Sequence, residues 1–219
     1  MTLTKRGMES LEKARLYGIC DLTYLNEGEA LPVSRKLLEG GAGVLQLRAK
    51  GRDPQDLTKL AIELRELCEE FAVPFVVNDH VQLARETGAH GLHLGQEDGS
   101  IAEARSTLGE EVIIGRSTHS LVQAEKALVE KADYIGFGPL FPTPTKEGRP
   151  AIGLGDIAAM EEKVGSRIPA FCIGGIKPDN LPEVLGAGAR RVVVVSHLLT
   201  HEQPSEASRQ LISQLTSNL

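Results

Sequence analysis

Short apolar runs alternate with amphipathic stretches along this chain, and the alternation repeats eight times. Most of the runs are almost continuously apolar, which is typical of strands buried on both faces of a parallel sheet. The pattern therefore predicts eight parallel strands, at residues 17–21, 44–48, 74–78, 91–94, 112–115, 133–137, 170–173 and 191–195.

The stretches between these runs have helical spacing, and several begin with residues that start helices. Pro54 and Pro204 fall at a first turn, where the missing N–H of proline costs nothing. The expected helices cover 30–40, 54–71, 80–87, 99–107, 120–131, 153–164, 179–186 and 204–217. Eight such units in 219 residues predict an α/β protein, a (β/α)8 TIM barrel forming a single domain over 1–219, with 1–14 as an N-terminal capping helix or a tail. A doubly wound open sheet is the alternative.

Composition limits the classes of partner. Thirty acidic against 24 basic side chains leave the chain net negative, so we expect no nucleic-acid or anionic-membrane surface. No apolar run reaches the roughly 18 residues of a membrane span, and the first residues lack the apolar core of a secretory signal. Cys20, Cys68 and Cys172 have no metal-ligand spacing, which indicates reduced structural thiols. The expectation is a soluble, cytoplasmic protein, and the oligomeric state stays open, a homo-oligomer included.

Polar side chains gather where the expected strands end, and in such barrels chemistry concentrates at the C-terminal strand ends. The second strand carries Gln46, Arg48 and Lys50, which strand alternation turns to one face. The alternative is a solvated basic edge. Asp79 and Asp98 follow the third and fourth strands and offer the oxygen ligands that suit Mg²⁺. Each could instead cap the helix that follows it.

Three other segments suggest binding of anions. Residues 138–146 interleave prolines with two threonines and a lysine, a rigid loop with anion-binding groups, although a proline-rich surface turn is the simpler reading of the loop alone. Residues 115–119 combine a glycine, a cation and two hydroxyls, which we read as a turn, with helix capping by Ser117 or Thr118 as the alternative. Gly174, Gly175 and Ser196 follow the last two strands, where barrels often bind phosphate. His93, in the fourth strand, is expected to be hydrogen-bonded inside the barrel, with metal binding as the alternative.

These blocks, in this order, resemble the thiamine-phosphate synthase family. The resemblance runs from about Tyr17 to Ser196 and is carried by residues 46–50, 78–79, 91–98, 115–119 and 138–146. The chain departs mildly from the family pattern at Cys20, before Asp21, and at His197, after Ser196.

The resemblance implies transfer of an aminopyrimidinylmethyl group from its diphosphate to the ring nitrogen of a thiazole phosphate, through a dissociative, carbocation-like step with one Mg²⁺ per site. It implies catalytic roles for Arg48, Lys50, Ser117 and Lys146, and metal binding by Asp79 and Asp98. The implied pyrimidine diphosphate ligands are Gln46, Leu47, Arg48, Ala49, Lys50, Asn78, Ser117 and Lys146. The implied thiazole phosphate ligands are Thr143, Pro144, Thr145, Gly175, Val195 and Ser196.

Two alternatives remain at this point. A thiazole tautomerase of the same fold would need a proton shuttle, for which His119 is a candidate, but would have no use for so many diphosphate ligands. A non-catalytic sensor of thiamine precursors would have no need of metal-binding carboxylates.

Overall fold

Eight parallel strands close into a barrel in the order of the sequence, from β1 to β8. The computed structural model describes residues 3–143 and 150–217. Closure is made by the first and last strands, which pair Leu16 with Val192 and Tyr17 with Val193. The predicted (β/α)8 barrel is confirmed, and the open sheet is wrong. The strands are β1 (Leu16–Asp21), β2 (Val44–Arg48), β3 (Phe75–Asn78), β4 (Gly91–Leu94), β5 (Ile113–Thr118), β6 (Tyr134–Phe137), β7 (Ala170–Ile173) and β8 (Val192–Val193).

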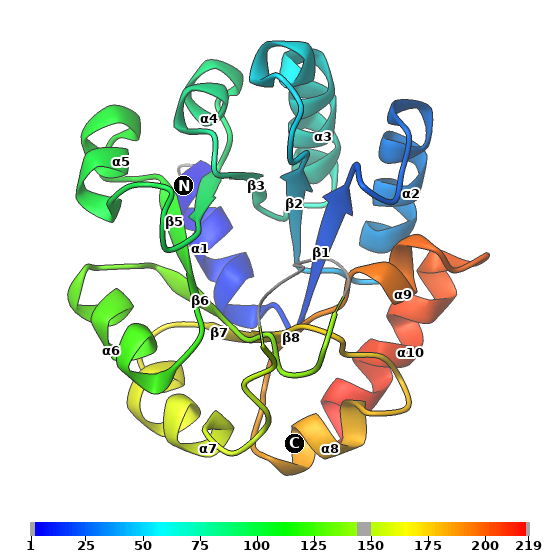
Figure 1. Ribbon diagram of the computed structural model, residues 1–219. Coiled ribbons are helices and arrows are strands. Elements are labelled where there is room, and N and C mark those ends of the chain that lie inside the picture. The colour runs from blue at the N-terminus through cyan, green and yellow to red at the C-terminus, as the bar shows by residue number, and fades with distance from the viewer. Residues whose placement is uncertain (1–2, 144–149, 218–219) are drawn as a thin grey trace.

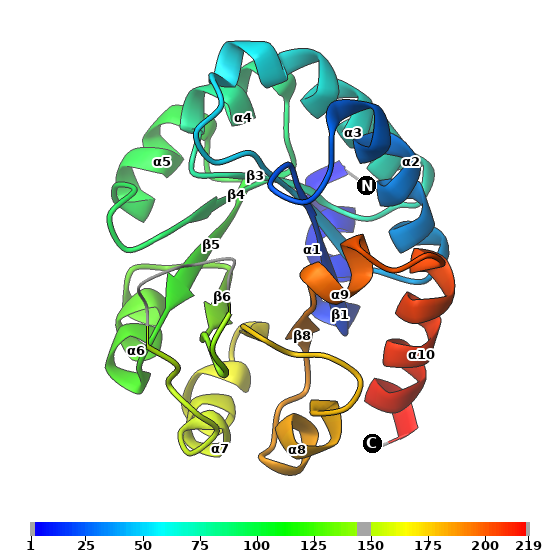
Figure 2. The ribbon, with the colours of Figure 1, turned by 45° about the vertical axis from the view of Figure 1, so that its right-hand side comes forward.

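Helices surround this ring of strands (Figures 1 and 2). Several begin at a polar cap, since the Asn26 and Ser100 side chains accept from the third backbone N–H of their helices in capping boxes. The helical elements are α1 (Leu3–Lys13), α2 (Glu27–Glu39), η1 (Pro54–Leu57), α3 (Thr58–Glu70), α4 (Val81–Thr87), α5 (Ile101–Leu108), α6 (Leu121–Val129), α7 (Ile157–Met160), the π turn η3 (Glu161–Gly165), α8 (Leu181–Gly186), α9 (Ser196–Leu199) and α10 (Pro204–Ser217).

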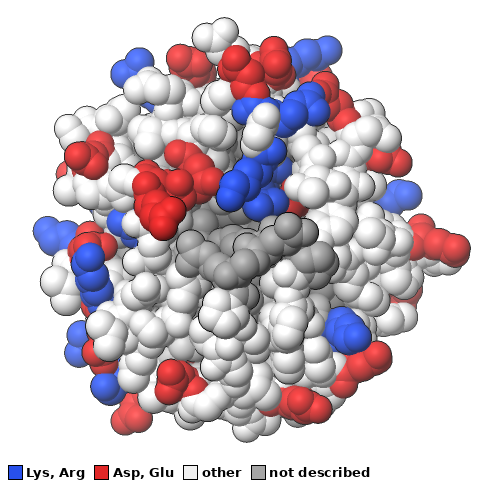
Figure 3. Space-filling model, viewed as in Figure 1, with Lys and Arg blue, Asp and Glu red and all other residues white. Residues whose placement is uncertain are grey.

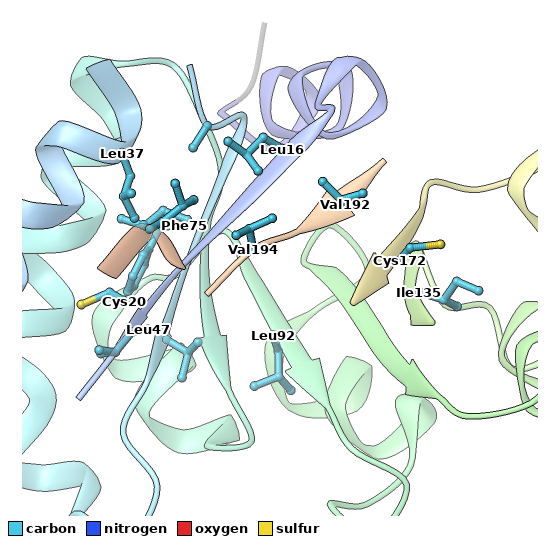
Figure 4. Close-up of a cluster of buried hydrophobic side chains, with 14 of the residues drawn as sticks. Leu16, Cys20, Leu37, Leu47, Phe75, Leu92, Ile135, Cys172, Val192 and Val194 are labelled. Atoms are coloured by element: carbon cyan, nitrogen blue, oxygen red, sulfur yellow. The ribbon is translucent and has the colours of Figure 1, made fainter. Parts of the chain in front are cut away.

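Strand alternation divides the apolar residues into two layers. One layer packs between the strands and the surrounding helices, with Leu47, Phe75 and Leu92 among its members (Figure 4). The other fills the barrel and includes Tyr17, Tyr134 and Phe171 together with Leu11 and Ala14, which belong to α1 and the residue after it. Helix α1 therefore covers the N-terminal end of the barrel and leaves the opposite end for a pocket.

Several of the expected elements differ from the structure. Strand β5 runs through Thr118 rather than stopping at Gly115, and β8 is only two residues long where five were expected. The helix expected over 153–164 begins at Ile157 and continues as a π turn. Helix α9, directly after β8, was not predicted.

All three cysteines are free and buried, as expected for structural thiols. Burial raises the pKa of the Cys20 thiol to about 12 and raises the pKa values of Cys68 and Cys172 as well. Within the described part of the chain, no helix is both long enough and apolar enough to cross a membrane.

Candidate active site

A pocket lies at the C-terminal ends of the strands and opens onto solvent. Its lining includes the last residues of β1, β2 and β3, which are Asp21, Arg48 and Asn78. On the face drawn in Figure 3, Lys and Arg side chains gather near the centre, with a group of Asp and Glu side chains to one side. The predicted site residues that line the pocket are Gln46, Arg48, Asn78, Ser117, Thr143, Gly175, Val195 and Ser196.

The other predicted residues of the second strand lie elsewhere. Leu47 is buried in the layer between strands and helices, because alternation turns it away from the face that carries Gln46 and Arg48 (Figure 4). Ala49, the residue after the end of β2, is buried in the same layer. Neither residue is part of the pocket lining, so their predicted contact with the substrate would come from backbone groups and stays a prediction. Lys50 is exposed and outside the pocket lining, because β2 ends at Arg48 and strand alternation does not extend past that residue. Pro144, Thr145 and Lys146 lie outside the described residues.

Arg48 is held at the pocket by a buried ion pair. Its Nη1 lies 2.6 Å from Oδ2 of Asp21, and the two side chains are 9% and 0% exposed. The other carboxylate oxygen of Asp21 accepts from the backbone N–H of Thr23 at 2.9 Å. The carboxylate thus compensates a guanidinium that would be costly to bury alone and fixes its direction toward the pocket.

Five polar side chains on five strands form a hydrogen-bonded chain across the pocket floor. Gln46 Nε2 donates to Tyr17 Oη at 3.0 Å, and the hydroxyls of Tyr17 and Tyr134 lie 2.9 Å apart. His93 then joins Tyr134 Oη through Nδ1 at 3.0 Å and Ser117 Oγ through Nε2 at 2.9 Å. His93 is therefore hydrogen-bonded inside the barrel, as predicted. Burial raises the pKa of both tyrosines, so both hydroxyls keep their hydrogen.

The two residues predicted to bind a metal both contact the backbone at or just after the end of β4, and neither is among the residues that line the pocket. Asp79 donates its backbone N–H to His93 O at 2.9 Å, and Asp98 Oδ2 accepts from the backbone N–H of Gly95 at 2.9 Å. The N-cap positions of the next helices are taken by His80 and Ser100, one and two residues after these carboxylates. Both carboxylates remain candidates for binding a cation.

Backbone geometry around these carboxylates is tightly constrained. Asp79 has φ of +63°, a left-handed conformation that costs a non-glycine residue about 1 kcal/mol or more. Arg116 donates through Nη1 to the carbonyls of Gly95 and Gly99, at 2.6 and 3.0 Å. It thereby braces the loop that carries Asp98, and its guanidinium is held outside the pocket lining.

A second polar region of the pocket lies beside β7 and β8. Leu140 N and Phe141 N donate to Ile173 O and Gly174 O at 2.9 and 3.1 Å, so the loop after β6 is bound to the loop after β7. A Cβ on Gly175 would lie 2.7 Å from that of Phe141, and only glycine permits this approach. Ser196 begins the short helix α9, and loops after the seventh and eighth strands with such a helix are a common phosphate site in barrels.

His119 also lines the pocket, with its Nδ1 bonded to Gly138 O at 2.5 Å. The segment around it is strand rather than the expected turn. Gly115 is required there because a Cβ would lie 2.1 Å from Cζ of Tyr134. Ser117 and Thr118 are strand residues, and the cap of α6 is Ser120.

Asp21 and the two tyrosines of the hydrogen-bonded chain were not predicted as site residues. The signal for Asp21 was present, since it ends the first apolar run as Arg48 ends the second. Tyr17 and Tyr134 fall inside apolar runs, where a tyrosine reads as core until the barrel closes and brings the hydroxyls together.

Comparison of this chain with known proteins identifies its family. The family model for thiamine monophosphate synthase matches residues 16–198. The chain belongs to this family. Its relatives include the thiamine-phosphate synthase of Acidothermus cellulolyticus, 40% identical over 95% of this chain and 98% of that protein. The thiamine-phosphate synthase of a Nostoc species is 43% identical over 94% of this chain and 57% of that protein. This thiamine monophosphate synthase family member thus spans about three fifths of the length of its Nostoc and Synechocystis relatives.

Solved structures agree with the family assignment. The thiamine phosphate pyrophosphorylase of Pyrococcus furiosus superposes with a TM-score of 0.84 at 33% identity and covers 98% of this chain and 99% of that one. A 3-hexulose-6-phosphate synthase superposes with a TM-score of 0.68 at 16% identity, over 91% of this chain and 98% of that one. This second likeness shows the fold alone.

Proposed function

We propose that the protein is a thiamine-phosphate synthase. It would join the aminopyrimidinylmethyl group of a pyrimidine diphosphate to the ring nitrogen of a thiazole phosphate and release diphosphate. The supporting observation is one pocket with two polar regions, one around Arg48, Asn78 and Ser117 and the other around Thr143, Gly175 and Ser196. Two anionic substrates need two such regions that open onto a shared space. The names of the relatives point the same way.

Arg48, Asn78 and Ser117 would bind the diphosphate, which leaves with several negative charges. Arg48 is suited to this because its guanidinium is always charged and already directed by Asp21. Fixed donors of this kind stabilise developing charge without reorganising during the step. Lys50 and Lys146 remain predicted diphosphate ligands from the flanking loops, and Gln46 would orient the pyrimidine edge. Backbone groups of Leu47 and Ala49 could serve on the same side.

Asp79 and Asp98 suit a magnesium ion. Both are oxygen donors beside the end of one strand, and the strained backbone of Asp79 is the kind of outlier that functional sites retain. Among the described residues, no three His, Cys, Asp or Glu side chains gather as ligands. An ion held here would therefore take most of its ligands from water and from diphosphate oxygens. When bound, it would neutralise charge on the departing diphosphate.

Thr143, Gly175, Val195 and Ser196 would hold the thiazole phosphate, with Pro144 and Thr145 as further predicted ligands. The thiazole nitrogen already has a free lone pair, so this side needs no general base. The pyrimidine cation would be captured by that nitrogen once diphosphate has departed. Water would compete for the cation, and the apolar walls formed by Ile19, Phe171 and Ile173 help to exclude it.

A turnover assay tests this proposal. With both substrates and MgCl₂, we expect thiamine phosphate and diphosphate in equal amounts, measured by mass spectrometry and a coupled diphosphate assay. A trifluoromethyl group in place of the pyrimidine methyl should slow the step by orders of magnitude, because it destabilises the cation. No product at any magnesium concentration would refute the synthase assignment, and an unchanged rate with the fluorinated substrate would refute the dissociative step.

The tautomerase reading is tested by His119, which lines the pocket. His119→Ala should change the synthase rate only a few-fold, because the proposed reaction needs no proton shuttle there. Isomerised thiazole phosphate as the sole product, lost in the folded His119→Ala variant, would favour the tautomerase instead.

Cytoplasmic location, a single-domain organisation and a homo-oligomeric state remain proposals. The free, buried thiols support a reducing compartment.

A further inference from the structure

The hydrogen-bonded chain on the pocket floor has a direction that its first donor imposes. Gln46 Nε2 can only donate, so the oxygen of Tyr17 accepts from it. The other described partner of Tyr17 is Tyr134, and Tyr17 is 2% exposed. If Tyr134 donated to Tyr17, the hydrogen of Tyr17 would be left buried and unused, which costs about 1–3 kcal/mol. Tyr17 therefore donates to Tyr134.

The same count of donors and acceptors fixes the direction of the remaining hydrogen bonds across the pocket. Tyr134 has a single hydrogen, and its next partner is His93 Nδ1 at 3.0 Å. That nitrogen must then accept, so the neutral ring carries its hydrogen on Nε2 and donates it to Ser117 Oγ at 2.9 Å. The Ser117 oxygen is occupied as an acceptor, and the hydroxyl hydrogen is left for the pocket that Ser117 lines.

We propose that His93 and Tyr134 are positioning residues that present Ser117 to the pocket as a hydrogen-bond donor, through a His93 ring with its hydrogen on Nε2. The group that receives this hydrogen bond is an anionic oxygen of the substrate. This inference rests on the proposed function for the identity of that oxygen, the leaving diphosphate, whereas the direction of the chain stands on the contacts alone.

The backbone of Ser117 is also fixed, so the hydroxyl is the part of this residue that can still reorient. Its carbonyl accepts from Gln96 Nε2 at 2.6 Å, and it lies in strand β5. A serine hydroxyl can serve as donor or acceptor, so an anion would bind more weakly to an undirected one. Directing it in advance removes that cost before the substrate arrives.

Nuclear magnetic resonance of the histidine nitrogens tests the direction in the ligand-free protein, without any activity. We expect His93 to carry its hydrogen on Nε2, with Nδ1 as a hydrogen-bonded acceptor, and Tyr134→Phe to shift the Nδ1 resonance. Tyr24→Phe, which removes a tyrosine hydroxyl outside the pocket lining, is the matched control and should leave it unchanged. A hydrogen on Nδ1, or an Nδ1 resonance indifferent to Tyr134→Phe, would overturn the proposal.

Single-turnover kinetics test whether His93 acts through Ser117. His93→Leu should slow the step about 10- to 100-fold, less than loss of a direct donor, with the KM for thiazole phosphate changed less than about twofold. The double variant with Ser117→Ala should be no slower than Ser117→Ala alone, because the two residues act as one unit. Multiplying effects would overturn the proposal.

A glutamine at position 93 separates direction from proton transfer. Its amide oxygen can accept from Tyr134 and its amide nitrogen can donate to Ser117, but it cannot carry a proton. His93→Gln should therefore recover to within about fivefold of the wild-type rate. A rate as low as that of His93→Leu would favour a proton-carrying imidazole and reject the proposal. If the wild type makes no thiamine phosphate but the nitrogen resonances are as expected, the proposed function fails and the direction of the chain stands.

Discussion

Arg48 can serve an anionic substrate from a buried position only because Asp21 lies against it. Removing one partner of a buried pair leaves the other charge uncompensated, which costs more than the net value of the pair. The same ion pair therefore stabilises the barrel and holds Arg48 in position to bind an anion in the pocket.

Substitution of Asp21 by Asn should destabilise the protein by about 3 kcal/mol, since Arg48 would stay buried without a countercharge. The measurement is urea unfolding followed by circular dichroism. Asp56→Asn, which removes the same charge from an exposed position in η1, should change stability by less than about 0.5 kcal/mol. Equal losses in the two variants would show that the ion pair contributes nothing.

Asp98 offers a second test at this scale. Asp98→Asn should raise the half-saturating magnesium concentration at least about tenfold, equivalent to 1.4 kcal/mol, because an amide is a weaker ligand for a hard cation. Rates across a MgCl₂ titration measure this, and calorimetric binding of Mg²⁺ with diphosphate checks it without turnover. Glu97→Gln, at the exposed neighbouring position, is the control. An unchanged magnesium requirement in Asp98→Asn would remove this residue from the metal site.

Sequence reasoning located single residues where strand ends could be recognised. It found Gln46, Arg48, Asn78 and Ser117 because polar residues at the ends of buried runs are conspicuous. It placed Leu47 and Ala49 in the site on family resemblance, and their side chains are buried between strands and helices, so that prediction now concerns their backbone groups. It could not find the Tyr17–Tyr134 contact, which exists only after the barrel closes.

At the scale of elements, the pairing of β5 with β6 decides the shape of the pocket floor. Gly115 is the register partner of Tyr134 and leaves room for its ring. The sequence suggested a turn at this glycine because glycine is common in turns, and the tight fit of a neighbouring strand is not visible in a local pattern. Apart from β8, which is shorter than expected, the remaining strands were predicted well, since continuous apolar runs mark them directly.

Gly115→Ala should therefore cost about 1–3 kcal/mol or more, because a Cβ would lie 2.1 Å from the ring of Tyr134. Thermal and urea unfolding measure the loss. The matched control is Gly186→Ala in α8, where a Cβ would meet no atom within 4 Å and helix propensity should add up to about 1 kcal/mol of stability. A Gly115→Ala variant as stable as the wild type would show that the ring moves freely.

For the molecule as a whole, the two ends of the barrel have separate tasks. Helix α1 fills the N-terminal end through Leu11, while the polar groups of the pocket occupy the C-terminal end. The sequence predicted this division from the repeated strand–helix units, but left residues 1–14 as either a helix or a tail. The amphipathic spacing of this segment alone could not show that it covers the N-terminal end of the barrel.

Leu11→Ala should lower the free energy of unfolding by about 2–5 kcal/mol, because it opens a cavity at a fully buried position. At temperatures where the variant remains folded, kcat/KM should be unchanged, since the pocket lies at the other end. Val129→Ala, at a position 82% exposed, should change stability by less than about 0.5 kcal/mol. A fall in kcat/KM that matches the loss of stability would show that the two ends are coupled.

The reaction rates of the three buried thiols report local opening of the folded chain. Only a thiolate reacts with alkylating reagents, and burial suppresses its formation at Cys20, Cys68 and Cys172 alike. They belong to β1, α3 and β7, so they sample different parts of the ring. Timed alkylation followed by peptide mapping would thus measure the rate at which each part opens, with no label introduced and no residue replaced.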